Sequence, residues 1–123
     1  MNVNIICVGK IKEDYFIKAT AEFEKRLSRF CNFNVTVLPD KAIPDNASKA
    51  EEEIVLKKEG EEILKKIGKS DIVVAMCIEG KQLSSEELAG KIADFQMVSS
   101  TIDFVVGGSL GLSPEVKLVR ILN

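Results

Sequence analysis

The stretch from Asp71 to Ile78 decides the fold, and it reads DIVVAMCI. Such a near-continuous apolar run is typical of strands that are covered on both faces, as in parallel sheets. Residues 102–106 (IDFVV) have the same character and lead directly into a glycine-rich turn. Together the two stretches predict a parallel sheet buried between helices.

Outward from these strands, the chain alternates between strand-like and helix-like patterns. Val3 to Val8 (VNIICV) predicts a buried strand, and Phe33 to Leu38 (FNVTVL), which is rich in β-branched residues, predicts a second one. Between them, apolar residues recur every three or four positions, which predicts a helix with a stripe that faces the core. The stripe consists of Phe16, Ala19, Phe23, Leu27 and Phe30. Because these phenylalanines should be buried, we expect none of them to stack on nucleic-acid bases.

Two further helices begin at recognisable caps. Ser48 has Glu51 three residues on, and Ser84 has Glu87, which is the spacing of a capping box. The first of these helices should run to about Ile67, with Gly68 in its C-cap region. Its expected apolar side comprises Ala50, Ile54, Ile63, Leu64 and Ile67. The run from Ser113 to Glu115 has the pattern of one more helix start.

The resulting order is β-α-β-α-β-α-β. Such alternation predicts an α/β fold, with a mostly parallel sheet and helices on both faces. The sequence contains no repeat and no linker, so we expect residues 1–123 to form a single domain.

Composition narrows the class of protein. Apolar residues make up 46% and charged residues 29% of the chain, as in ordinary soluble domains. No apolar run approaches the roughly 20 residues that span a bilayer, and the start lacks a basic segment before its apolar stretch. We therefore expect a cytoplasmic protein with no membrane partner. The net charge of −2 gives no global support for nucleic-acid binding, so any RNA contact must come from a local patch or from a second subunit.

The chain has no histidine and three cysteines, none of them at CxxC spacing. Cys7 and Cys77 lie inside apolar runs and are expected to be buried, reduced thiols. A catalytic thiol would lack its usual activating base, and no cluster of zinc ligands is visible, so no metal is expected.

Glycine turns end two of the predicted strands. Residues 107–112 read GGSLGL, which is neither a P-loop nor the GxGxxG fingerprint of dinucleotide-binding folds. Glu79-Gly80-Lys81 closes the neighbouring apolar strand. Either turn alone is more often simple geometry than a ligand cradle. Together they could line one crevice beyond the carboxyl ends of the strands, with the apolar contacts and backbone groups that an adenosine needs.

The first third of the chain is locally basic. A row of lysines and arginines at this spacing is more often a solvated helix face, and the functional alternative is contact with RNA phosphates. The residues are Lys10, Lys12, Lys18, Lys25, Arg26 and Arg29.

Four segments, in order, resemble one known family. They are IICVGKIKEDYFIKATAEFEKRL (5–27), LPDKAIPDNASKAEEEIVLKKEGEEIL (38–64), MCIEGKQLSSEELA (76–89) and FVVGGSLGL (104–112). They resemble the ribosomal RNA large subunit methyltransferase H family, whose fold is similar to that of other SPOUT enzymes. The resemblance implies a homodimer that uses S-adenosylmethionine to methylate N3 of a pseudouridine in 23S rRNA.

The resemblance also implies cofactor-binding residues. Met76 and Gly107 match family residues that contact S-adenosylmethionine, and Ile78, Gly80 and Gly108 lie beside them. No residue here is assigned as the group that takes the N3 proton, and no metal is implied.

The chain departs from the family after GGSLGL. Family members continue through a strand, a cofactor loop, a Pro-His-Gln turn and a knotted helix, none of which is recognisable here. We therefore expect a C-terminally incomplete domain, with a trefoil knot only if that segment exists. Either the protein stops early, or a tract is missing between Lys117 and Leu118. Two alternatives stay open: a non-catalytic relative that dimerises or binds ribosomes, and a nucleotide- or flavin-binding α/β domain.

Overall fold

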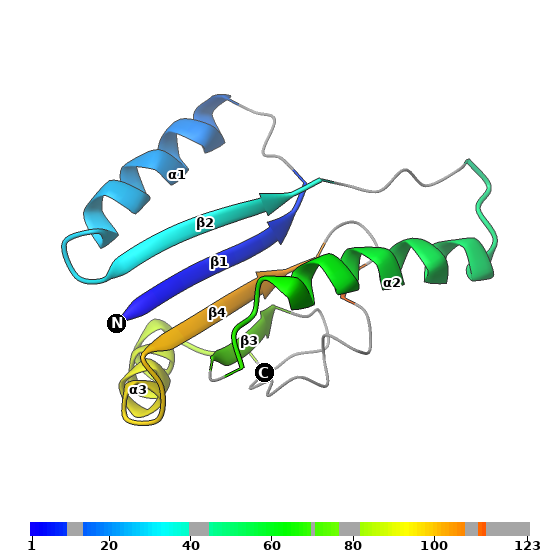
Figure 1. Cartoon of the computed structure of the whole chain (residues 1–123). Helices are drawn as coiled ribbons and strands as arrows, with labels where there is room; N and C mark the ends of the chain where they lie inside the picture. The colour runs from blue at the N-terminus through cyan, green and yellow to red at the C-terminus, as the bar shows by residue number, and fades with distance from the viewer. Residues whose placement is uncertain (10–13, 40–44, 70, 77–81, 108–110, 113–123) are drawn as a thin grey trace.

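The structure is a computed structural model of the chain, and it describes residues 1–9, 14–39, 45–69, 71–76, 82–107 and 111–112. Its elements follow the order β1 (Asn2–Val8), α1 (Asp14–Leu27), β2 (Asn32–Leu38), α2 (Lys49–Lys65), β3 (Ile72–Met76), α3 (Ser85–Gln96) and β4 (Thr101–Val106). The strands form one sheet in the order β2-β1-β4-β3, and every neighbouring pair is parallel (Figure 1). The predicted fold class is therefore confirmed.

Both predicted capping boxes are present. The Ser48 hydroxyl accepts the Glu51 amide at 3.1 Å, and the Glu51 carboxylate accepts the Ser48 amide at 3.4 Å. Ser84 and Glu87 form the same pair at 3.1 and 3.2 Å. Each box satisfies amides at a helix start that have no partner within the helix, which explains why α2 and α3 begin where they do.

Two apolar clusters lie on opposite faces of the sheet. On one face, Ile63 of α2 packs with Ile6, Val73 and Val105 from three strands. On the other face, Phe95 of α3 packs with Ile72 and Ile102. Helices therefore cover both faces, as the apolar strands require.

The expected apolar side of α2 is wrong in its first half. Val55, rather than Ile54, is buried there, while Ile54 and Ala50 are exposed. Figure 1 shows this half of the helix extending past the ends of the strands, so little of the sheet lies beneath it. The second half, with Ile63, conforms to the expectation.

The expectation of a buried stripe on α1 is also wrong. On the helix, Phe23 is 60% exposed, and Ala19 and Leu27 are exposed as well. The helix ends at Leu27, so Phe30 lies in the turn that follows and is 82% exposed. The side chain of Phe16 lies outside the part that the structure describes. Figure 1 shows α1 beside β2, the outermost strand on that side, rather than across the middle of the sheet. Because α1 lies at the sheet margin, the described part of its apolar stripe, from Ala19 to Leu27, is left open in a single copy of the chain.

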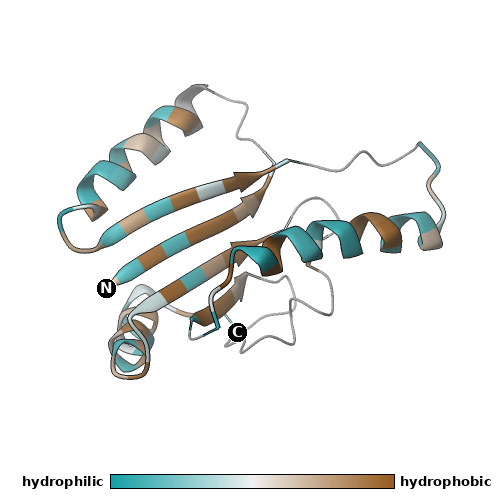
Figure 2. Ribbon diagram, viewed as in Figure 1, coloured by the Kyte–Doolittle hydropathy of each residue, from teal (hydrophilic) through white to brown (hydrophobic). Residues whose placement is uncertain are grey.

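Two rows of polar side chains cross the sheet at its amino end, and we call them the asparagine rows. In the first, Asn32 donates to Asn2 at 3.0 Å and Asn2 donates to Thr101 at 3.4 Å. In the second row, the Asn34 amide donates to Oδ1 of Asn4 at 3.4 Å. Figure 2 shows the rows as hydrophilic bands on β1 and β2. Residues in each row face one another directly in the strand register, so the amides help to fix that register.

Candidate functional site

The carboxyl ends of β3 and β4 lie side by side. Met76 pairs with Val106 in the parallel register, and Val106 also pairs with Cys7 of β1. The prediction that these two strand ends are neighbours is thereby confirmed. The side chains of Met76 and Val106 are both exposed, so this edge of the sheet offers apolar surface where α/β folds place their ligands.

Gly107 follows Val106 and marks a close approach of two backbone segments. A Cβ atom placed on Gly107 would collide with the carbonyl of Gly111 and would lie 3.0 Å from Cδ2 of Leu112. Gly111 itself has a φ of +82°, in the left-handed region that favours glycine. The glycines at both positions are therefore required by the geometry of the turn.

The structure brings Met76 and Gly107 to the same edge of the sheet. The other predicted cofactor-binding residues, Ile78, Gly80 and Gly108, lie outside the described residues, as do Lys117 and Leu118. The exposed side chains of Met76 and Val106 suit the adenosine part of S-adenosylmethionine, which needs apolar contact. Whether these residues bind it stays a prediction.

Leu112 packs beside Gly107, and no pattern in the sequence identified it as part of this region. It is 5% exposed and belongs to the cluster on the α2 face of the sheet. The only hint in the sequence was its place directly after the last glycine of the turn, where a leucine looks like any loop residue.

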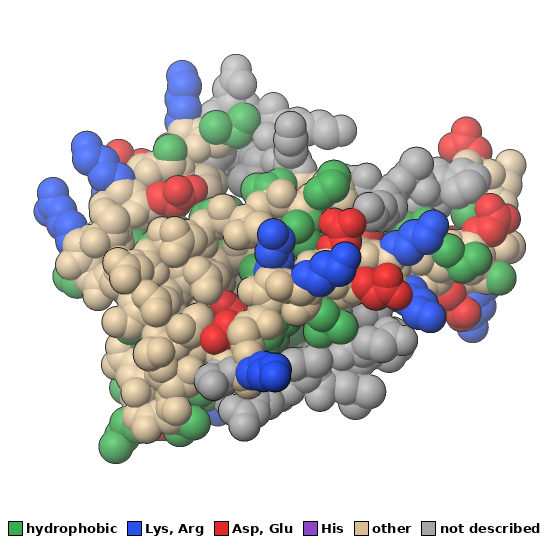
Figure 3. Space-filling view, in the orientation of Figure 1, with side chains coloured by type: hydrophobic (Ala, Val, Ile, Leu, Met, Phe, Trp, Pro, Cys, Tyr) green, Lys and Arg blue, Asp and Glu red, His purple; other side chains and the backbone are tan. Residues whose placement is uncertain are grey.

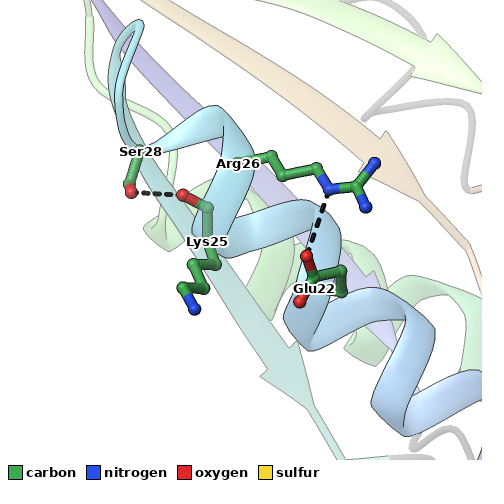
Figure 4. Close-up of polar contacts among 4 residues, drawn as sticks. All are labelled: Glu22, Lys25, Arg26 and Ser28. Carbon is green, nitrogen blue, oxygen red and sulfur yellow. Dashed lines mark hydrogen bonds and ion pairs between the residues drawn. The ribbon is translucent and has the colours of Figure 1, made fainter.

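The basic face of α1 is at the surface. Figure 3 shows Lys and Arg side chains projecting from the α1 side of the molecule, and Lys18, Lys25 and Arg29 are exposed. In the last turns of the helix, Arg26 donates to Glu22 at 3.1 Å, and the Ser28 hydroxyl donates to the Lys25 carbonyl at 2.7 Å (Figure 4). An exposed ion pair of this kind is worth little on its own, so these cations remain available for electrostatic contact with a polyanion. Lys10 and Lys12 lie outside the described residues.

A buried carboxyl, Asp103, lies in the middle of β4, and no motif in the sequence marks it. Asp103 is 0% exposed, and its Oδ1 accepts from Asn4 at 2.8 Å, which completes the second asparagine row. Burial, followed by a hydrogen bond with Asp71, raises the pKa of Asp103 to about 7 against the opposing effect of Asn4. Among the described residues, no donor reaches Oδ2 of Asp103. The neighbouring Asp71 is also a carboxyl, so a hydrogen bond between the two requires that one of them carries a proton. A protonated Asp103 that donates to Asp71 would satisfy both oxygens.

Cys7 is half-buried rather than buried as expected, and Cys77 lies outside the described residues. The Cys7 thiol lies 3.7 Å from the Thr36 carbonyl, which can accept a hydrogen bond from it. Burial raises the pKa of Cys7, which disfavours the reactive thiolate. The described residues contain no group of three or more potential metal-ligating side chains. No helix within the described ranges is long and apolar enough to span a bilayer.

A family model and individual relatives both identify this chain as similar to methyltransferases. Residues 1–120 match the family described as "Predicted SPOUT methyltransferase". The chain is similar to the ribosomal RNA large subunit methyltransferase H of Lactiplantibacillus plantarum, with 52% identity over 117 residues that cover 94% of this chain and 74% of that protein. It is also similar to the proteins of the same name from Streptococcus uberis, at 49% identity, and Streptococcus suis, at 48%, each over 95% of this chain and 74% of the relative.

Proposed function

Because this chain belongs to the SPOUT methyltransferase family, we propose that it methylates ribosomal RNA of the large subunit, with S-adenosylmethionine as methyl donor and N3 of a 23S pseudouridine as acceptor. The observation that carries the proposal is the identity of about half of the residues, over 94–95% of the chain, to relatives named as rRNA large subunit methyltransferases. The cofactor and the target atom come from the family resemblance.

Residues 1–123 would act as one SPOUT-like domain. Bound S-adenosylmethionine would supply an electrophilic methyl group for an in-line displacement. The contribution of this chain would be to hold donor and acceptor in near-attack geometry. Met76 and Val106 would provide apolar contact for the cofactor, and the Gly107 backbone would lie close to it. The residue that takes the N3 proton is not assigned.

We further propose that the active protein is a cytoplasmic homodimer. The open apolar stripe of α1 supports an interface between copies, because large apolar groups left in water mark contact surfaces. The basic face of α1 is proposed to contact rRNA phosphates, since the net charge of −2 leaves binding to local patches.

The decisive experiment is methylation of ribosomes from a strain that lacks this modification. The purified protein and labelled S-adenosylmethionine should transfer label to 23S rRNA, and mass mapping should place the methyl group on a single pseudouridine. Label on another base, or on protein, would contradict the assignment. Calorimetric titration with S-adenosylmethionine separates the enzyme from a non-catalytic relative, and a flavin spectrum of the purified protein would favour the nucleotide- or flavin-binding alternative.

The prediction that Lys117 and Leu118 are not neighbours in the native protein still stands as a prediction. It can be tested by sequencing the gene and by measuring the intact mass of the protein from its natural source. A mass that matches the 123 residues would refute a missing tract.

A further inference from the structure

Leu112 lies deep in the core although it comes after the strand has ended. Its side chain is 5% exposed and belongs to a cluster with residues of β1, β2, β3, β4 and α2, among them Val105 and Ile63. Six residues beyond Val106, Leu112 is therefore packed into the same core as the strands.

The burial of Leu112 determines what packs against Gly107. The Gly111 carbonyl occupies the space where a Gly107 side chain would be, and Cδ2 of Leu112 lies 3.0 Å from that same point. Gly111 reaches this place only through a left-handed φ of +82°. Gly111 and Leu112 therefore pack against one side of the Gly107 backbone. Burial of the Leu112 side chain in the core fixes both of them.

We propose that Leu112 is a positioning residue for the cofactor pocket: its anchoring in the core holds the Gly107 backbone in the place that S-adenosylmethionine requires. The inference rests on the proposed function, which puts the cofactor at the Met76 and Gly107 edge. Leu112 acts through Gly111 and Gly107, so its loss should act on cofactor affinity as well as on stability.

A matched control separates the two effects. Leu38 belongs to the same cluster, is 6% exposed, and lies on β2, two strands away from β4. Leu112→Ala and Leu38→Ala remove the same atoms from the same core, so both should lower the melting temperature. Only Leu112→Ala should also weaken S-adenosylmethionine binding, by about tenfold in Kd measured by calorimetry, whereas Leu38→Ala should change it by less than about twofold.

Two further variants keep the test decisive if Leu112→Ala does not fold. Leu112→Met conserves volume and should restore cofactor affinity to within about twofold of the wild type. Gly111→Ala strains the left-handed backbone and should weaken cofactor binding while leaving the core side chains in place.

Equal losses of affinity in Leu112→Ala and Leu38→Ala, or unchanged affinity in Gly111→Ala, would overturn the inference. A wild-type protein that binds no S-adenosylmethionine would instead overturn the proposed function, and the inference with it.

Discussion

At the scale of single residues, two glycines should respond in opposite directions to the same change. Gly107→Ala places a methyl group on the Gly111 carbonyl, so it should lower the free energy of unfolding and abolish detectable S-adenosylmethionine binding. Gly90→Ala, in α3, meets nothing within 4 Å and should raise the free energy of unfolding by about 0.5–1 kcal/mol. Urea unfolding of both variants checks the signs, and a stable, cofactor-binding Gly107→Ala protein would contradict the geometry of the turn.

Asp103 should make stability depend on pH. Its pKa is raised in the folded state, from 3.8 to about 7, so the folded protein holds this proton more tightly than the unfolded chain does. The stabilising contribution is therefore complete below about pH 4 and is lost as the pH rises through about 7. Urea unfolding at pH 5 and pH 8 should show the wild type less stable at pH 8.

The control for this effect is Asp103→Asn, which keeps the shape and the neutral state of the side chain. In this variant the difference in stability between pH 5 and pH 8 should shrink markedly. A wild type that gains stability across the same range would show that Asp103 is ionised in the fold. The sequence IDFVV did not indicate that this carboxyl is buried, because a carboxyl inside an apolar strand can face either water or a partner. Its partners are Asn4 of β1 and Asp71, which directly precedes β3.

At the scale of helices and strands, the features set by local sequence were predictable and those set by packing were not. The strands and both capping boxes follow from residues within a few positions of one another, and they are found where expected. The exposure of Ile54 and Phe23 depends on how far each helix lies from the sheet, which no pattern along the chain contains. For the site, the adjacency of the strand ends was predicted from two apolar strands that each lead into a glycine turn, whereas no pattern predicted the anchoring of Leu112.

The cap of α2 gives a direct test of helix stability. Ser48→Ala removes the hydroxyl that accepts the Glu51 amide and should lower the free energy of unfolding by about 1 kcal/mol. Ser48→Asp should retain the stability, because aspartate also caps and its charge suits a helix N-terminus. Urea denaturation distinguishes the two variants, and equal stability of Ser48→Ala and the wild type would show that α2 gains nothing from its cap.

The basic face of α1 should act through charge. Replacing Lys25 and Arg29 by glutamate should weaken binding to a 23S rRNA fragment and reduce the slope of log affinity against log salt concentration, because fewer counterions are released. The matching change of Lys57 and Lys58, which are exposed on α2, provides the control for net charge. Filter binding at several salt concentrations measures the RNA affinity of both double variants. The assignment of RNA binding to α1 fails if the two pairs lose affinity equally.

At the scale of the whole molecule, the open stripe on α1 predicts how copies associate. Phe23→Asp should convert a dimer into a monomer, because it puts a charge into a surface that a second copy would cover. Met97→Asp is the control, since Met97 is also a large exposed apolar residue but lies at the end of α3. Light scattering at micromolar concentration reports the mass of each. A Phe23→Asp protein that remains dimeric would place the interface elsewhere.

The asparagine rows have a consequence for the order in which the chain is built. Asn4 and Asp103 are hydrogen-bonded across a sequence separation of 99 residues, so the strand made first finds its central neighbour only after β4 has been synthesised. At ribosomal rates of about 5–20 residues per second, β1 waits roughly 5–20 seconds with one of its edges unpaired. During that interval an apolar strand edge is open to pairing with other nascent chains, and its polar amides make a mismatched partner costly. The rows thus suit a protein in which the central strand pair, β1 with β4, forms only after the other strands have been synthesised.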